Sequence, residues 1–130
     1  THNYDPHVWF DITLWMQTVE KITITMMEKD PENASFYRKN AANYLTKLEA
    51  LHKKCKEQMN EIPEKSRLMI TSHDAFEYFG RAYNIEVKGL QGISTVAEYG
   101  LKDITNMVNL IVEKNVKAVF VESAVSSKSL

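Results

Sequence analysis

Two histidines stand in similar local settings and could bind a metal ion. His7 follows the pair Asp5-Pro6, and His73 lies in the predicted turn Ser72-His73-Asp74 after an apolar stretch. We expect each histidine beside a helix start, where the partial positive charge disfavours the imidazolium form of the ring. The neutral ring is the form that binds a metal. The alternative for each ring is structural, as a helix cap or as a partner of a backbone carbonyl group.

Two glutamates are candidates for the same site. Glu122 ends a predicted strand at the sheet edge where His73 is expected, and Glu98 follows a loop that contains Gly92. Open parallel sheets bind ligands outside the carboxyl ends of their strands. Each carboxylate could bind the metal or accept a hydrogen bond from a ligating imidazole. The sequence leaves both roles open.

Two other classes of function are compatible with these residues. A metal-dependent hydrolase would use His7, His73, Asp74 and Glu122, with an open metal position and a general base. A structural or adhesive helical module would use the histidines only as caps. The sequence contains no nucleophile constellation, and its single cysteine, Cys55, stands in no reactive setting. We therefore expect a binding protein rather than an enzyme.

A long helix is predicted over residues 30–62, opening at Asp30-Pro31 and stopped by Pro63. Apolar or weakly polar residues recur along it in steps of three and four, which mark one helix face. They are Tyr37, Ala41, Tyr44, Leu48, Leu51, Cys55, Met59 and Ile62. At about 1.5 Å per residue this helix is a rod of roughly 45 Å, long enough to join two lobes.

The sequence on the two sides of this helix differs in pattern. Before it, apolar steps of three and four residues predict one helix over residues 6–28. After it, short apolar runs alternate with amphipathic stretches, which indicates an α/β arrangement with a parallel sheet. The predicted strands are residues 68–71, 85–90 and 118–121, and the predicted helices are residues 75–83 and 100–114.

Composition excludes several classes of protein. The 130 residues are 44% hydrophobic and 25% charged, as in a globular domain. A net charge of −1 gives no support for nucleic acid as a partner. The sequence has no run of about 18 apolar residues that would predict a membrane span.

Five motifs occur in order along the whole chain. They are Asp5-Pro6-His7-Val8-Trp9-Phe10-Asp11, Asp30-Pro31-Glu32-Asn33, Thr71-Ser72-His73-Asp74-Ala75-Phe76-Glu77-Tyr78-Phe79, Val87-Lys88-Gly89-Leu90-Gln91-Gly92-Ile93-Ser94-Thr95 and Val119-Phe120-Val121-Glu122-Ser123. In these motifs the chain resembles the TroA-like (ZnuA-like) metal-binding receptors. These are the solute-binding proteins of bacterial ABC transporters for manganese, zinc or iron.

The resemblance implies four metal ligands, two of which match residues of this chain. The histidine of the Asp-Pro-His motif corresponds to His7, and the histidine of the second lobe corresponds to His73. The other two, a histidine of the first lobe and a carboxylate near the carboxyl end, would lie before Thr1 and beyond Leu130. The site would then be incomplete here. Similar manganese receptors often carry glutamate where His73 stands, so a nitrogen ligand there leans toward zinc without settling the metal.

The resemblance also implies a domain organisation. Residues 1–29 would be the C-terminal part of an N-terminal lobe, residues 30–63 the long interlobe helix, and residues 64–130 the first half of a C-terminal α/β lobe. The metal would be held between the lobes and passed to an ABC permease outside the cytoplasm, from a cell-surface lipoprotein or a free periplasmic form. Any membrane contact would be through a lipid anchor outside the fragment. The open sheet edge and apolar helix face lead us to expect that the fragment self-associates.

Overall fold

The computed structural model describes residues 4–91 and 100–121, and these form two compact units. One unit is Val8–Gln58, and the other combines Thr1–His7 with Met59–Leu130. The described elements, in chain order, are η1 (Val8–Phe10), α1 (Ile12–Lys29), η2 (Pro31–Asn33), α2 (Ala34–Asn60), η3 (Glu64–Ser66), β1 (Leu68–His73), α3 (Glu77–Tyr83), β2 (Glu86–Gln91), α4 (Leu101–Glu113) and β3 (Val119–Phe120).

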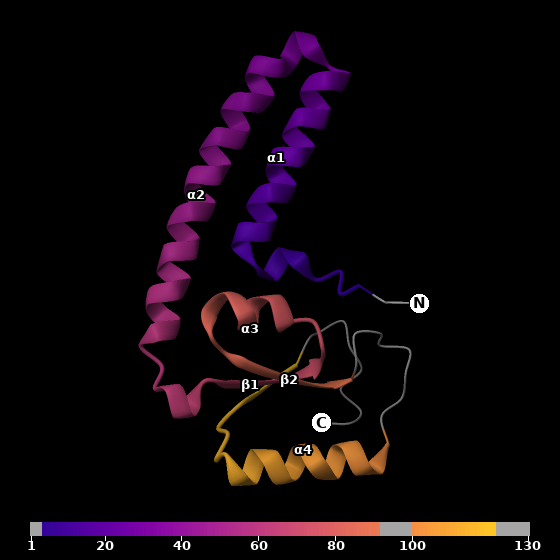
Figure 1. Ribbon diagram of the computed structural model, residues 1–130, viewed down its shortest axis with the longest axis vertical. Helices are drawn as coiled ribbons and strands as arrows, with labels where there is room; N and C mark the ends of the chain where they lie inside the picture. The colour runs from indigo at the N-terminus through magenta and orange to yellow at the C-terminus, as the bar shows by residue number, and fades with distance from the viewer. Residues whose placement is uncertain (1–3, 92–99, 122–130) are drawn as a thin grey trace. The chain divides into compact units, whose positions relative to one another are not determined.

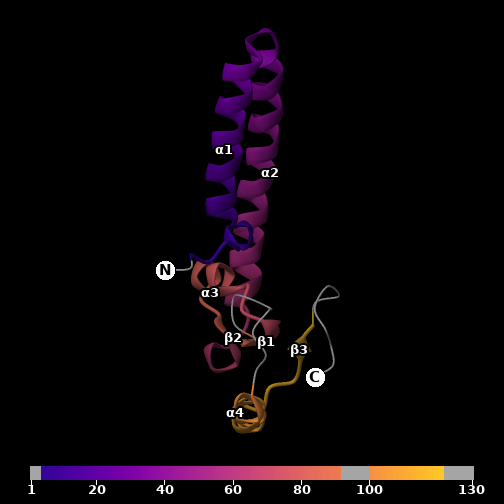
Figure 2. The same ribbon diagram turned by 90° about the vertical axis from the view of Figure 1, so that its right-hand side faces the viewer.

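The unit Val8–Gln58 is a helical hairpin, in which α1 and α2 run side by side in opposite directions (Figures 1 and 2). The Trp15 indole N–H donates to the Tyr44 hydroxyl across the hairpin, at 3.1 Å. Among the described residues, the helices are too short or too polar to cross a bilayer.

Helix α1 begins later than the sequence predicted. Its N-cap is Asp11, whose carboxylate accepts from the Thr13 backbone N–H at 2.9 Å and from the Thr13 hydroxyl at 2.6 Å. Asp5 instead accepts from the backbone N–H of His7, at 2.9 Å. The Asp-Pro pair therefore does not start a long helix, because a second acidic residue six positions later satisfies the first turn of α1.

The long helix α2 also starts inside its predicted bounds, because residues Pro31–Asn33 form a 3₁₀ turn before it. Its predicted face is wrong at two steps. Tyr44 and Leu51 are 44% and 46% exposed, and the adjacent Leu45 and His52 are less exposed. Because apolar residues stand next to one another at Tyr44-Leu45, the pattern does not fix which of them packs.

Among its described residues, the other unit contains a three-stranded parallel sheet in the order β2-β1-β3. In the central strand β1, Ile70 pairs with Val119 of β3 and with Lys88 of β2. Ile70 is 1% exposed and is the centre of the core, which also contains Ala75, Tyr83, Ile85 and Val87. The α/β class predicted from the alternation of strand and helix is confirmed.

The sequence predicts an apolar face of the last described helix, α4, at Leu101, Ile104, Val108, Ile111 and Val112, and only part of this face is buried where the helix packs beside β2. Leu101, Val108 and Val112 are 81%, 51% and 74% exposed. The partly buried positions are Ile104 and Ile111, which the pattern predicts, together with Met107 and Leu110. After the helix, Asn115 has a φ of 53°, in the left-handed region, which is typical of the residue after a helix end.

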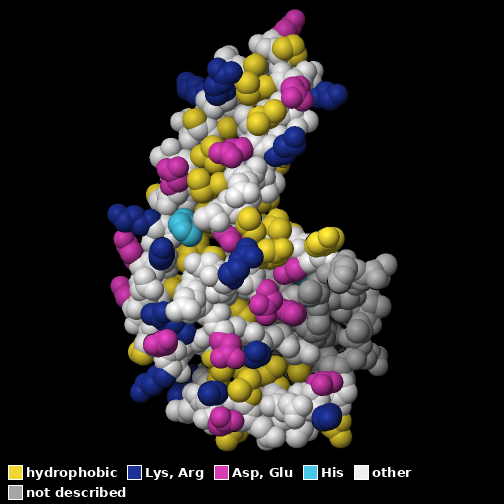
Figure 3. Space-filling model, in the orientation of Figure 1, with side chains coloured by type: hydrophobic (Ala, Val, Ile, Leu, Met, Phe, Trp, Pro, Cys, Tyr) yellow, Lys and Arg dark blue, Asp and Glu magenta, His cyan; other side chains and the backbone are white. Residues whose placement is uncertain are grey.

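Charge is distributed without a single-sign field on the face drawn in Figure 3. Lysine and arginine side chains alternate there with aspartate and glutamate side chains, and apolar side chains lie between them. This agrees with the net charge of −1.

Gly80 allows α3 to approach β2 closely. A Cβ at this position would lie 2.6 Å from the Ile85 carbonyl oxygen and 2.7 Å from Val87 Cγ2. We predict that Gly80→Ala lowers the free energy of unfolding of the full-length protein by about 1–3 kcal/mol, as overpacking typically does. Urea unfolding measures this. Gly100→Ala is the matched control, because among the described residues its new Cβ would meet only Asp103 Oδ2, at 3.5 Å. Equal losses for the two variants would contradict the packing argument.

In the turn between α1 and α2, Asp30 accepts hydrogen bonds that change its own pKa and that of Tyr37. The Tyr37 hydroxyl donates to Asp30 Oδ2 at 2.6 Å, and the Asn33 side-chain amide donates to the same oxygen at 2.9 Å. The Tyr37 bond, and then the Asn33 bond, hold the pKa of Asp30 below its ordinary 3.8. The same Tyr37–Asp30 bond raises the pKa of the Tyr37 hydroxyl above 10.0.

This pair gives the turn a predicted pH window. The stability that ionised Asp30 contributes to the fold is fully present above its ordinary pKa of 3.8 and is lost as the pH falls through the lowered pKa. The stability that the protonated Tyr37 hydroxyl contributes is fully present below its ordinary pKa of 10.0 and is lost as the pH rises through the raised pKa. We predict that Tyr37→Phe raises the pKa of Asp30 toward 3.8, measured by carbon-13 NMR titration of its carboxyl group. An unchanged Asp30 pKa would show that the hydrogen bond has no effect.

Candidate metal site

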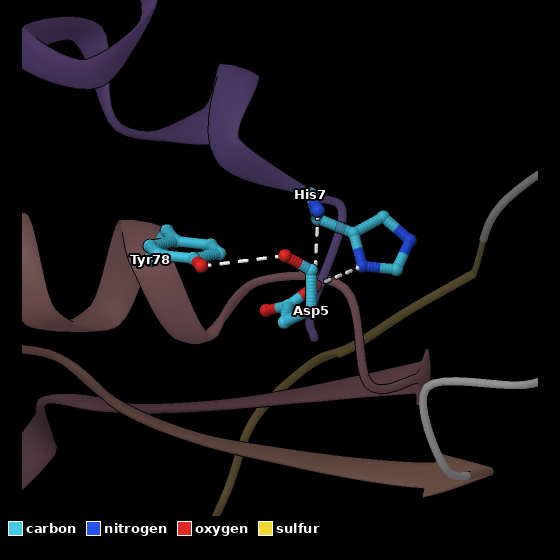
Figure 4. A network of polar contacts seen from close by, with 3 residues as sticks. All are labelled: Asp5, His7 and Tyr78. Carbon is cyan, nitrogen blue, oxygen red and sulfur yellow. Dashed lines mark hydrogen bonds and ion pairs between the residues drawn. The ribbon is translucent and has the colours of Figure 1, made fainter. Parts of the chain in front are cut away.

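His7 is held by the carboxylate two residues before it. Asp5 Oδ1 lies 2.6 Å from His7 Nδ1 and also accepts from the His7 backbone N–H at 2.9 Å (Figure 4). An ionised carboxylate can only accept, so Nδ1 must carry the proton and Nε2 the lone pair of the neutral ring. Both side chains are largely buried, with 12% of His7 and 15% of Asp5 exposed. The arrangement is the one by which proteins orient a ligating imidazole.

His73 is the last residue of the central strand β1 and is 6% exposed. Its backbone carbonyl accepts from the Thr71 hydroxyl at 2.8 Å and from the Ala75 N–H at 3.1 Å. These two bonds turn the chain sharply after the strand. His73 therefore lies at the carboxyl edge of the parallel sheet, as the sequence predicted.

The structure brings the two histidines together. Their ring centroids are 5.5 Å apart, with 70° between the ring planes. Both belong to the same compact unit, although 66 positions separate them in the printed sequence (73 − 7 = 66). Two imidazoles at this separation can share one metal ion between their nitrogens, since each Zn–N bond is about 2.0–2.1 Å long.

The predicted helix starts beside the histidines are wrong. Residues Val8–Phe10 after His7 form only a 3₁₀ turn, and α3 begins at Glu77, four residues after His73. A helix N-terminus therefore does not explain why either ring would be neutral. For His7 the structure supplies a different constraint, the Asp5 carboxylate, which fixes the nitrogen that carries the proton.

The other predicted ligands cannot be placed in this site. Glu98 and Glu122 lie outside the described residues. Within residues 4–91 and 100–121, no group of three or more histidine, cysteine or acidic side chains could hold a metal. Asp74 follows His73, and its Oδ1 is buried without a hydrogen-bond partner in the described part of the chain, as is Ser72 Oγ.

Three residues that position the histidines were missed or misread from the sequence. The Asp5-Pro6 pair predicts a helix start, although an Asp-x-His spacing also lets a carboxylate reach the following ring. Tyr78 donates from its hydroxyl to the Asp5 carbonyl oxygen at 3.3 Å, over 73 positions of sequence (Figure 4). Gly89 of β2 lies against the turn after His73, where a Cβ would be 2.6 Å from the Asp74 nitrogen and 2.8 Å from the His73 carbonyl carbon. Only a structure reveals these last two contacts.

Comparison with known proteins places the chain in a family. Residues 1–130 match the family described as "ZnuA: Zinc-uptake complex component A periplasmic". The chain belongs to this family. It is 50% identical over 127 residues to the "Manganese-binding lipoprotein MntA" of Bacillus subtilis, which covers 98% of the chain and 42% of that relative. It is 34% identical over 127 residues to the "Zinc-binding protein TroA" of Treponema pallidum, with 98% of the chain and 41% of the relative covered.

Solved structures agree with this assignment. The structure titled periplasmic zinc binding protein TroA from Treponema pallidum matches with a TM-score of 0.93 at 34% identity, over 98% of this chain and 46% of that one. Fe(III)-bound YtgA from Chlamydia trachomatis matches with a TM-score of 0.93 at 27% identity, over 99% of this chain and 50% of that one. The chain thus spans less than half the length of the curated relatives that it matches. Their α/β fold is shared, and the family resemblance read from the five motifs is confirmed.

The close approach at Gly89 predicts a local effect on His73. We expect Gly89→Ala to lower the free energy of unfolding of the full-length protein by about 1–3 kcal/mol, because the new methyl group overlaps backbone atoms. We also expect it to shift the imidazole proton resonances of His73. Lys88→Ala in the same strand is the control, since Lys88 is exposed and pairs only weakly with Glu86 at 3.4 Å. His73 resonances that move equally in both variants would contradict a specific role for Gly89.

Proposed function

We propose that the full-length protein is the metal-binding receptor of a bacterial ABC transporter and that His7 and His73 are two of its metal ligands. The observation that carries the proposal is the 5.5 Å separation of the two rings in a chain of this family. The cargo is zinc or manganese, with iron as a further candidate. Relatives and neighbours carry names that specify manganese, zinc and Fe(III).

The remaining ligands would come from parts of the full-length protein that this chain does not include. Two imidazoles make up half of a four-ligand site, and borderline metals such as zinc accept nitrogen and carboxylate ligands together. In the proposed receptor the long helix α2 is the rigid connection between two lobes, and metal binding ties the lobes together. The loaded shape is then recognised by the permease, outside the cytoplasm, where the receptor is a lipoprotein or a periplasmic protein.

Binding and release require no covalent chemistry from the protein. The names of the relatives, which describe metal-binding proteins, support a transport receptor over the hydrolase considered from the sequence. The role of the histidines as helix caps, which the structural or adhesive alternative requires, does not agree with the positions of the helix starts.

The proposal is tested by metal titration of the full-length protein with zinc and manganese in competition. We predict tight binding of at least one metal and a loss of affinity of about 100-fold or more for His7→Ala and for His73→Ala, because each removes a direct ligand. His52→Ala on α2 is the matched histidine control and should bind as the unchanged protein does. Failure of the unchanged protein to bind either metal, or full affinity in both ligand variants, would refute the proposal.

A further inference from the structure

Tyr78 joins the two segments that carry the histidines. It lies in the first turn of α3, the helix that follows His73 after a short connection. Its hydroxyl donates to the backbone carbonyl oxygen of Asp5, two residues before His7, at 3.3 Å (Figure 4). The carbonyl group of Asp5 lies outside any helix or strand, so this bond satisfies a backbone acceptor that has no ladder partner.

Asp5 connects this bond to the ring of His7. Its main chain is held by Tyr78, while its carboxylate holds His7 Nδ1 at 2.6 Å. Pro6, between them, has a fixed φ and restricts the backbone of Asp5 as well. A displacement of the Asp5 backbone is therefore transmitted to the orientation of the His7 ring.

The hydroxyl of Tyr78 can be separated from the rest of its side chain. The aromatic ring is half-buried, and the Arg81 guanidinium carbon lies 4.9 Å from the ring centroid. Phenylalanine would keep the ring, its packing and this cation–π contact, and would lose only the hydrogen bond to Asp5.

We propose that Tyr78 is a positioning residue for the metal site. Its hydrogen bond to the Asp5 carbonyl group, called the latch below, holds the His7 segment against the helix after His73. The inference rests on the proposed function, because its effect is read on the bound metal. With the latch in place, the two rings are held near each other before the metal arrives. Without the Tyr78 hydrogen bond, the His7 segment moves away from His73 more often. The His7 ring then dissociates from a bound metal more readily, and the metal is released faster.

The test is the rate of zinc release from the full-length protein, measured by stopped flow with a chelator in excess. We expect Tyr78→Phe to release zinc about three- to tenfold faster, the range for the loss of one neutral hydrogen bond, with the association rate changed less than twofold. The backbone amide of His7 should also exchange its hydrogen faster in the metal-free variant. A merely structural role would lower the unfolding temperature without this split between the two rates.

Tyr37→Phe is the matched control, because it also removes a tyrosine hydroxyl bound to an aspartate, in the helical hairpin unit. It should leave zinc release unchanged. Equal release rates for Tyr78→Phe and the unchanged protein, with binding still abolished in His7→Ala, would overturn the latch and leave the receptor standing. Absence of zinc and manganese binding in the unchanged protein would overturn both.

If Tyr78→Phe unfolds, unchanged zinc release in Arg81→Gln, which keeps the hydroxyl, would support the latch, and faster release would overturn it.

Discussion

The hydrogen bond between Asp5 and His7 is the constraint on which the proposed site depends. Its 2.6 Å length and its partly buried setting make it a strong, charge-assisted contact. It selects one tautomer of the ring and leaves Nε2 as the nitrogen with a lone pair. The residue that supplies it also accepts from Tyr78 through its main chain. One aspartate therefore controls both the chemistry and the position of the first histidine.

The second histidine depends on the parallel sheet. β1 is the central strand, and at its carboxyl end His73 pairs with Gln91 of β2 and is 6% exposed. The Thr71 hydroxyl and the Ala75 N–H fix the carbonyl of His73, and Gly89 leaves room for the turn that follows. Side chains on such rigid elements hold a ligand geometry better than side chains on long loops do.

The sequence predicted the elements and the family well, and predicted the contacts between them poorly. Alternation of apolar runs predicted the parallel strands, and the ordered motifs around His7 and His73 pointed to the receptor family, as the comparisons confirm. The helix starts were wrong because an Asp-Pro pair has more than one local use, and the choice depends on whether another cap, here Asp11, is available. The predicted buried faces of α2 and α4 were partly wrong, because where apolar residues are adjacent in sequence either of them can face the core. Tyr78 and Gly89 act across long sequence separations, which no local pattern encodes.

We propose that Asp5 fixes the ring of His7 so that Nε2 binds the metal. Nitrogen-15 NMR of the histidine rings in the zinc-loaded full-length protein tests it directly, because zinc is diamagnetic and shifts the nitrogen that it binds. We predict a protonated Nδ1 and a zinc-bound Nε2 for His7. Zinc on Nδ1 of His7, or His7 resonances that do not change when zinc binds, would contradict it.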